Sequence, residues 1–277
     1  MPKVSEVLAG SLLDRLDAEL FLGEVLNFSP TELFAQPDFE ISEAALARFH
    51  AFEKSRLAGK SVAVILGHKE FFGLDFFVNE NVLIPRPETE LLVAEILKIA
   101  PRSLLDVGTG SGCVAISAKK NLPHCRVSAS DVSPAALAVA QKNSQNLGVE
   151  IELIESDLLE KISDEFEVIA ANLPYIPDDS REIQKSVADF EPRLALYGGA
   201  DGLDLIRKLL IQISKLPQKP KFVLLEFGGG AQTEILEKFA QEIFSDSEIT
   251  ILPDLAGIAR VLKISRIVKT LKSNKER

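Results

Sequence analysis

The pattern of apolar and polar positions divides the chain into two parts. Over residues 1–70, apolar side chains recur at intervals of three and four positions, which predicts a module of short helices. Ser29 is placed to cap one helix, with Pro30 in its first turn and Glu32 closing a capping box, and Ser42 begins another. We therefore expect a small helical domain over residues 1–70.

A phenylalanine-rich segment follows this domain. Residues 71–78 have the sequence Phe-Phe-Gly-Leu-Asp-Phe-Phe-Val, which predicts a hairpin or turn within a linker over residues 71–84. Packing in a core explains most of these aromatic side chains, and the alternative is a patch that binds a partner.

From residue 104 onward, strand-like and helical segments alternate, which predicts an open sheet of parallel strands joined by crossover helices. The expected strands cover residues 104–107, 126–130, 151–154, 167–171, 222–226, 248–252 and 260–267. The expected helices cover residues 114–120, 133–146 and 233–244. The fold class is therefore α/β, with a Rossmann-like seven-stranded sheet over residues 85–277.

Composition narrows the possible functions. The formal net charge is −10, and acidic side chains outnumber basic ones in the helical domain, which argues against direct nucleic-acid binding. Cys113 and Cys125 belong to no Cys-x-x-Cys or Cys/His pattern, so we expect no metal site. The early acidic residues argue against a signal peptide, and the lack of a long apolar run argues against a membrane span. We expect a cytoplasmic monomer without a membrane partner, whose basic tail from Ser265 is a solvated end.

A glycine-rich segment lies between the first strand of the sheet and the next helix. Its sequence is Asp106-Val107-Gly108-Thr109-Gly110-Ser111-Gly112, and the missing side chains let a ligand approach the backbone and the helix N-terminus. Asp131, at the end of the second strand, is placed to bind ribose hydroxyls. The segment also fits a dinucleotide-binding pattern, so it predicts either NAD or S-adenosylmethionine, and the alternative without a ligand is a tight turn.

The ends of the next two strands favour S-adenosylmethionine. Asp157 follows the third strand and suits the exocyclic amine of adenine, and Leu158 is placed to pack on the adenine face. Asn172 follows the fourth strand at the same carboxyl edge. Polar residues at successive strand ends are typical of a methyltransferase. Taken alone, Asp157 is equally suited to cap a helix.

The segment Asn172-Leu173-Pro174-Tyr175 is suited to presenting a planar amide nitrogen to a methyl donor. The Asn172 side-chain oxygen and the Leu173 carbonyl would accept the two N–H groups, while Pro174 stiffens the turn and Tyr175 provides a flat wall. A methylated amide nitrogen is acidic enough to lose its proton without a tuned base. The plain alternative is a turn that closes a strand.

Together these motifs resemble the release-factor glutamine methyltransferases over nearly the whole chain. Further matching segments are Ile65-Leu66-Gly67-His68, Phe71 to Leu74, Val82 to Glu90, Ser130 to Pro134 and Phe190 to Leu196. The resemblance implies a methyltransferase sheet, an N-terminal substrate-recognition domain, and transfer of a methyl group from S-adenosylmethionine to the glutamine of the Gly-Gly-Gln motif of class-1 peptide-chain release factors.

The resemblance also assigns roles to residues. It implies that residues 108–112 (Gly108, Thr109, Gly110, Ser111 and Gly112) line the methionine part of the donor, that Asp131 binds its ribose, and that Asp157 and Leu158 bind its adenine. It implies that Asn172, Leu173, Pro174 and Tyr175 hold the glutamine.

Three features of the resemblance leave questions open. The family's usual Asn-Pro-Pro-Tyr has Leu173 at its second position here, so the turn is either equivalent through its backbone carbonyl or adapted by a changed pocket. Arg86 and Glu88 either shape the pocket mouth or form an ion pair at the first helix, and the loop from Glu191 to Arg193 has the same two interpretations.

Three other functions compete. Amino-methylation of adenine or cytosine in DNA uses the same geometry, but the chain has no long insertion to read a target sequence. An NAD-dependent oxidoreductase and a non-catalytic sensor of the cofactor also fit the glycine-rich segment. Tight binding of S-adenosylhomocysteine without NAD binding would exclude the oxidoreductase, and methyl transfer to a protein would exclude the sensor.

Overall fold

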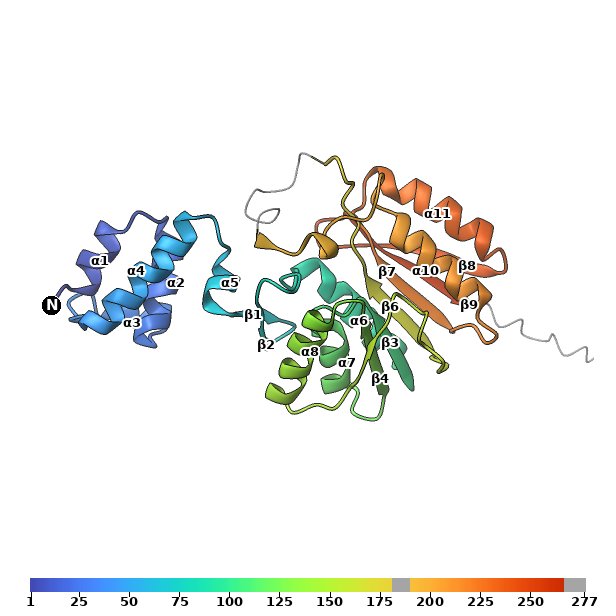
Figure 1. Ribbon diagram of the computed structural model, residues 1–277, viewed down its shortest axis with the longest axis horizontal. Coiled ribbons are helices and arrows are strands. Elements are labelled where there is room, and N and C mark those ends of the chain that lie inside the picture. Colours follow the sequence, from blue (N-terminus) through green and yellow to red (C-terminus); the bar gives the residue numbers. More distant parts are fainter. Residues whose placement is uncertain (181–189, 267–277) are drawn as a thin grey trace, which may run out of the picture.

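A computed structural model describes residues 1–180 and 190–266. The N-terminal module consists of α1 (Val4–Gly10), α2 (Arg15–Leu26), α3 (Pro30–Ala35), α4 (Glu43–Leu57) and α5 (Val62–Leu66), which lie apart from the sheet (Figure 1). Ser29 forms the expected capping box with Glu32, and the Ser42 hydroxyl accepts from the Ala45 amide. Phe21, Leu22, Ile41 and Phe49 form a small separate core. The predicted helical region is confirmed.

A β-hairpin connects the helices to the sheet. It pairs β1 (His68–Phe71) with β2 (Leu74–Phe77), and the two turn residues between them, Phe72 and Gly73, have φ of 52° and 72°. This is the geometry of a type I′ turn, which matches the twist of a two-stranded ribbon. Phe71 and Phe76 are fully buried in the core beneath the sheet, so packing explains these aromatic side chains.

The main sheet has seven strands in the order β5-β4-β3-β6-β7-β9-β8. Its strands are β3 (Ser103–Val107), β4 (Arg126–Asp131), β5 (Glu152–Glu155), β6 (Val168–Asn172), β7 (Phe222–Glu226), β8 (Ser247–Pro253) and β9 (Ala259–Arg266). The seven predicted strands are confirmed. The first five in sequence run parallel, whereas β9 is antiparallel to both neighbours, so the sheet is mixed.

The antiparallel strand follows from the chain length between β8 and β9. Only residues 254–258 separate the two strands, and a parallel crossover needs a dozen residues or more. The predicted solvated tail begins at Ser265, but Ser265 and Arg266 belong to β9 and pair with its neighbouring strands. Ile267, the predicted end of the last strand, and the rest of the tail lie outside the described residues.

Helices cover both faces of the sheet (Figure 1). One face carries α6 (Glu90–Ile99), α7 (Cys113–Asn121) and α8 (Pro134–Asn146), and the other carries α10 (Asp204–Lys215) and α11 (Ala231–Ile243). Leu104 packs in the core on the α6 and α7 face, and Leu105 packs in the core on the α10 and α11 face, because successive side chains of a strand point to opposite faces of the sheet. Helix α10 was not among the predicted elements. A single 3-10 turn, η1 (Pro87–Thr89), precedes α6.

In the described part of the chain, no helix combines the length and apolar character that a membrane crossing needs.

Candidate active site

The glycine-rich segment forms a tight loop between β3 and α7, which we call the glycine loop (residues 108–112). Gly108, Gly110 and Gly112 have φ of 72°, 55° and 81°, in the left-handed region that side chains rarely adopt. A Cβ on Gly112 would lie 2.8 Å from Ile116 Cδ1 and 3.2 Å from Ala140 Cβ. Glycine therefore allows the turn and lets α7 and α8 pack closely.

Asp131 braces this loop from the end of β4. Its Oδ2 accepts from the Gly110 amide and its Oδ1 from the Ser133 amide, both at 2.9 Å. Burial raises the pKa of Asp131, against the lowering effect of these backbone amides. Each carboxylate oxygen keeps a second acceptor position, so the side chain is able to bind a ligand while it holds the loop.

Asp106, at the buried end of β3, is a second brace that was not among the predicted site residues. Its Oδ2 accepts from Thr109 Oγ1 at 2.7 Å and from the Ala115 amide at 3.3 Å. Burial raises the pKa of Asp106 to about 6, although the Thr109 hydroxyl bond opposes the shift. Asp106 therefore connects the glycine loop to the first turn of α7.

Asp157 and Leu158 follow β5 at the same edge of the sheet. Lys208 Nζ, from α10, lies 2.6 Å from Asp157 Oδ2, and turns rather than a helix begin at Asp157. The helix-cap interpretation of Asp157 is therefore wrong. Leu158 is 7% exposed and has φ of 51°, a left-handed value that is uncommon for leucine.

The Asn172 side chain points from the end of β6 toward Thr89, the last residue of η1. Asn172 Nδ2 donates to Thr89 Oγ1 at 2.9 Å, and Thr89 is 2% exposed. Because the two polar atoms of a carboxamide diverge, this bond directs Asn172 Oδ1 away from Thr89. Among the described residues, no protein donor reaches that oxygen.

The partly buried Tyr175 and the fully buried Glu226 form a polar pair beside Asn172. The Tyr175 hydroxyl donates to Glu226 Oε1 at 3.4 Å, and Glu226 is the cross-strand partner of Asn172 at the end of β7. Burial raises the pKa of Glu226 to about 7, against the lowering effect of Thr89, Tyr175 and Arg260. Burial and the nearby Glu226 also raise the pKa of Tyr175.

Leu173, the residue that departs from the usual motif, fills space behind the glycine loop. It is 4% exposed and belongs to the core on the α10 and α11 face. A Cβ added to Gly108 would lie 2.8 Å from Leu173 Cδ2. The two residues are therefore complementary, which favours the interpretation that the pocket is adapted to leucine.

Arg86 and Glu191 join two of the predicted motifs. Arg86 Nη2 lies 2.6 Å from Glu191 Oε1, and Glu191 Oε2 accepts from the Ile84 amide at 3.1 Å. Glu191 is 5% exposed. The ion pair that the sequence suggested between Arg86 and Glu88 is therefore replaced by one that ties the two segments of the pocket mouth together.

A cavity of about 290 Å³ lies between these elements. All predicted site residues line it except Gly112 and Tyr175. Gly112 lies under α8, and the Tyr175 hydroxyl is bonded to Glu226. Lining residues that the sequence did not single out include Thr89, Asp106 and Ala136. In the described ranges, no group of three or more His, Cys, Asp and Glu side chains is arranged so that it could hold a metal ion.

Comparison with known proteins decides the family. Residues 3–67 match the PrmC N-terminal domain, and residues 87–190 match the Methyltransferase small domain. A release factor glutamine methyltransferase of Koribacter versatilis is 39% identical over 256 residues, covering 90% of each chain. Another from Geobacter sulfurreducens is 36% identical over 252 residues, covering 90% of this chain and 88% of that protein. This chain belongs to the release factor glutamine methyltransferases.

Solved structures agree on the fold of this methyltransferase family member. The ribosomal protein L11 methylase of Lactobacillus delbrueckii has a TM-score of 0.51 at 23% identity, covering 68% of this chain and 83% of that one. The hMettl16 catalytic domain, solved in complex with an RNA hairpin, has a TM-score of 0.59 at 13% identity, covering 91% and 92%. Such low identities support the shared fold alone.

Proposed function

We propose that this chain transfers a methyl group from S-adenosylmethionine to the side-chain amide nitrogen of the glutamine in the Gly-Gly-Gln motif of class-1 peptide-chain release factors. The observation that carries the proposal is the Asn172 carboxamide, which Thr89 orients at the edge of the cavity that the glycine loop also lines. Relatives that are 36–39% identical bear the name of this activity.

The lining of the cavity supports S-adenosylmethionine as the donor. The glycine loop is open to the methionine part of S-adenosylmethionine, since a Cβ on Gly110 would meet no atom within 4 Å. Asp131 would accept from the ribose hydroxyls, and Asp157 and Leu158 would hold the adenine. The bound donor supplies a methyl group activated by a positively charged sulfur.

The 172–175 turn would hold the acceptor. Asn172 Oδ1 and the Leu173 carbonyl would accept the two N–H groups of the substrate amide, which aligns its lone pair with the methyl group. Pro174 limits the freedom of the turn, and Tyr175 supports it through Glu226. Positioning of this kind contributes roughly 7–11 kcal/mol to lowering a barrier. The product nitrogen is acidic and releases its proton without a dedicated base.

The proposal extends to the whole chain. Residues 1–70 would recognise the release factor, residues 71–84 would link the domains, and residues 85–277 would carry the reaction. The protein would act in the cytoplasm as a monomer on a protein substrate, without contacting nucleic acid or membrane, in keeping with its net charge of −10.

Mass spectrometry of a methylated release factor tests the proposal. A purified class-1 release factor is incubated with isotopically labelled S-adenosylmethionine and this protein, and the Gly-Gly-Gln peptide is then sequenced. We expect one labelled methyl group on the glutamine, and none when that glutamine is replaced by glutamate. Label on adenine or cytosine of added DNA, or no label on the peptide, would overturn the proposal.

A further inference from the structure

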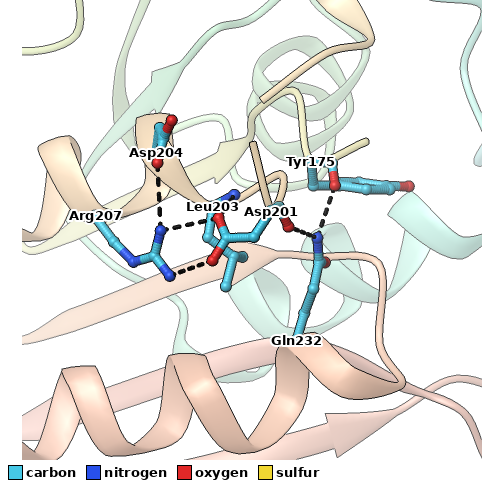
Figure 2. Close-up of polar contacts among 6 residues, drawn as sticks. All are labelled: Tyr175, Asp201, Leu203, Asp204, Arg207 and Gln232. Atoms are coloured by element: carbon cyan, nitrogen blue, oxygen red, sulfur yellow. Dashed lines mark hydrogen bonds and ion pairs between the residues drawn. The ribbon is translucent and has the colours of Figure 1, made fainter. Parts of the chain in front are cut away.

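Gln232, in the first turn of α11, joins three loops by its side-chain amide, and Figure 2 shows its contacts with two of them, at Tyr175 and Asp201. Its Nε2 donates to the Tyr175 carbonyl at 2.8 Å and to the Asp201 carbonyl at 2.9 Å. Its Oε1 accepts from the Gly228 amide at 2.9 Å. The three loops are the 172–175 turn, the turn before α10, and the segment after β7.

The chemistry of these contacts requires a neutral primary amide. Two partners of Gln232 are carbonyl oxygens that only accept, and the third is a backbone N–H that only donates. A glutamine side chain provides two donors and one acceptor in one rigid plane. Glutamate lacks both donors, and methionine lacks all three groups.

Glycines bring these backbones unusually close together. A Cβ on Gly202 would lie 2.0 Å from the Tyr175 carbonyl oxygen and 2.6 Å from Gln232 Nε2. A Cβ on Gly198 would lie 2.2 Å from the Pro174 carbonyl oxygen. The 172–175 turn therefore lies in close contact with the 198–202 segment on its carbonyl side.

Asp201, whose carbonyl Gln232 contacts, is held in turn by its side chain to Arg207 of α10. Arg207 Nη1 lies 2.9 Å from Asp201 Oδ1, Arg207 Nη2 contacts the other oxygen, and the Leu203 amide donates to Asp201 Oδ1 at 3.1 Å (Figure 2). The Arg207 hydrogen bond lowers the pKa of Asp201, so this carboxylate stays ionised. A continuous path of bonds thus runs from α10 through Asp201 and Gln232 to Tyr175.

We propose that Gln232 is a positioning residue for methyl transfer: it holds the carbonyl of Tyr175, and so keeps Asn172 and the Leu173 carbonyl aligned on the substrate amide. This inference rests on the proposed function, which it extends to a residue of α11 that does not line the cavity. A displacement of the turn by about 1 Å is sufficient to lower a rate by on the order of 10²-fold.

Four variants test this role. Gln232→Glu keeps the shape of the side chain and removes both donors, and Gln232→Met keeps the length without a charge. Gln241 is exposed on the same helix, so Gln241→Glu and Gln241→Met are matched controls for charge and helix propensity. For each protein, kcat and KM for the release factor and the affinity for S-adenosylhomocysteine are measured.

We expect both Gln232 variants to lower kcat by on the order of 10–10²-fold while the affinity for S-adenosylhomocysteine stays within about threefold, since Gln232 touches the turn and not the glycine loop. Values of kcat within about twofold of the Gln241 controls would overturn the inference. A parallel loss of cofactor affinity would also overturn it, because it would indicate general loosening of the fold.

Tyrosine emission provides a readout that does not depend on activity. The chain has two tyrosines and no tryptophan, so Tyr197→Phe leaves Tyr175 as the sole tyrosine. In that background we expect acrylamide to quench Tyr175 more strongly in Gln232→Glu than in Gln241→Glu. Equal quenching would contradict the proposal that Gln232 holds the Tyr175 carbonyl in place. Absence of methyl transfer by the unsubstituted protein would instead overturn the proposed function, and with it the role of Gln232 in transfer.

Discussion

Asn172 Nδ2 donates to Thr89 Oγ1 across 83 residues of sequence. A carboxamide that rotates by half a turn presents its nitrogen where its oxygen was. The Thr89 hydroxyl donates to the Glu226 carboxylate, whose pKa this bond lowers, so Thr89 Oγ1 is left to accept from Asn172 Nδ2 and the Asn172 oxygen faces the cavity. In the proposed reaction only the oxygen is useful there, because the substrate amide needs an acceptor. The turn after β6 and the segment before α6 therefore build the site together.

Asn172→Ala should abolish most of the turnover and leave the donor site intact. The substrate amide loses an acceptor that counts most in the transition state, so we expect kcat to fall by on the order of 10²–10³-fold. Calorimetry should give an affinity for S-adenosylhomocysteine within a few-fold of the unsubstituted protein. An unchanged kcat would remove Asn172 from the reaction.

Thr89→Val should lower kcat by roughly tenfold. Valine has nearly the shape of threonine but cannot accept from Asn172 Nδ2, so the carboxamide becomes free to turn. Thr89→Ser keeps the hydroxyl and is the matched control. If the Val and Ser variants had equal kcat values, orientation by Thr89 would not matter to the reaction.

Asp131→Ala should weaken binding of the donor. The ribose hydroxyls would lose a charged acceptor worth roughly 1.5–3 kcal/mol, and the Gly110 amide would lose its partner. Titration with S-adenosylhomocysteine should therefore show an affinity at least about tenfold lower. Equal affinity in the two proteins would show that the ribose lies elsewhere.

Leu173→Pro should reduce stability and activity. Residue 173 is 4% exposed and packs on Gly108, so the smaller ring of proline removes buried apolar contacts and costs roughly 1–3 kcal/mol of unfolding free energy. Urea unfolding measures the cost, and kcat/KM on one release factor measures the effect on transfer. If kcat/KM were preserved or raised, the turn would act only through its carbonyl and the leucine packing would be dispensable.

Glu226→Gln should make stability less sensitive to pH. The pKa of Glu226 rises from its ordinary value of 4.5 to about 7 in the folded protein, so the fold binds this proton more tightly than the unfolded chain does. Stability is therefore lost as the pH increases from about 4.5 through 7, and glutamine removes this loss. Relative to the unsubstituted protein, we expect the variant to gain on the order of 2–3 kcal/mol between pH 5 and pH 8.

Urea unfolding of both proteins at the two pH values gives this difference, in which the titration of Asp106 and other groups common to both proteins largely cancels. A difference that does not change with pH would mean that Glu226 titrates near its ordinary value.

Much of the fold can be predicted from the sequence, because burial gives apolar residues a regular spacing along each strand and helix. β7 occupies residues 222–226, as predicted, since it is apolar on both sides in the centre of a covered sheet. Helix α10 was not predicted, although its buried apolar positions recur at helical spacing, at Ile206, Leu209, Leu210 and Ile213. The direction of β9 has a different origin, because a strand's residues do not encode its direction and the short connection from β8 is the informative signal.

Only some of the site residues can be predicted from the sequence. Asp131, Asp157 and Asn172 are detectable because polar residues at the ends of apolar strands interrupt a clear pattern, and Glu226 carries the same signal. Thr89 and Gln232 carry none. Their partners are single atoms brought close by the fold, and for Gln232 all three are backbone groups, which leave no trace in the identity of the residues.

Asn143, buried in α8, connects the β1–β2 hairpin to the glycine loop that lines the cavity. Its side chain accepts from the Phe77 amide at 2.7 Å and donates to the Phe77 carbonyl at 2.9 Å and to the Ser111 carbonyl at 2.8 Å. One carboxamide thus fastens the hairpin to the glycine loop. A chain shortened to begin at residue 85 would leave Asn143 with Ser111 as its single partner, and it would lose Phe71 and Phe76 and so uncover the core that they cover. In evolution, the catalytic sheet is therefore expected to be inherited together with its hairpin.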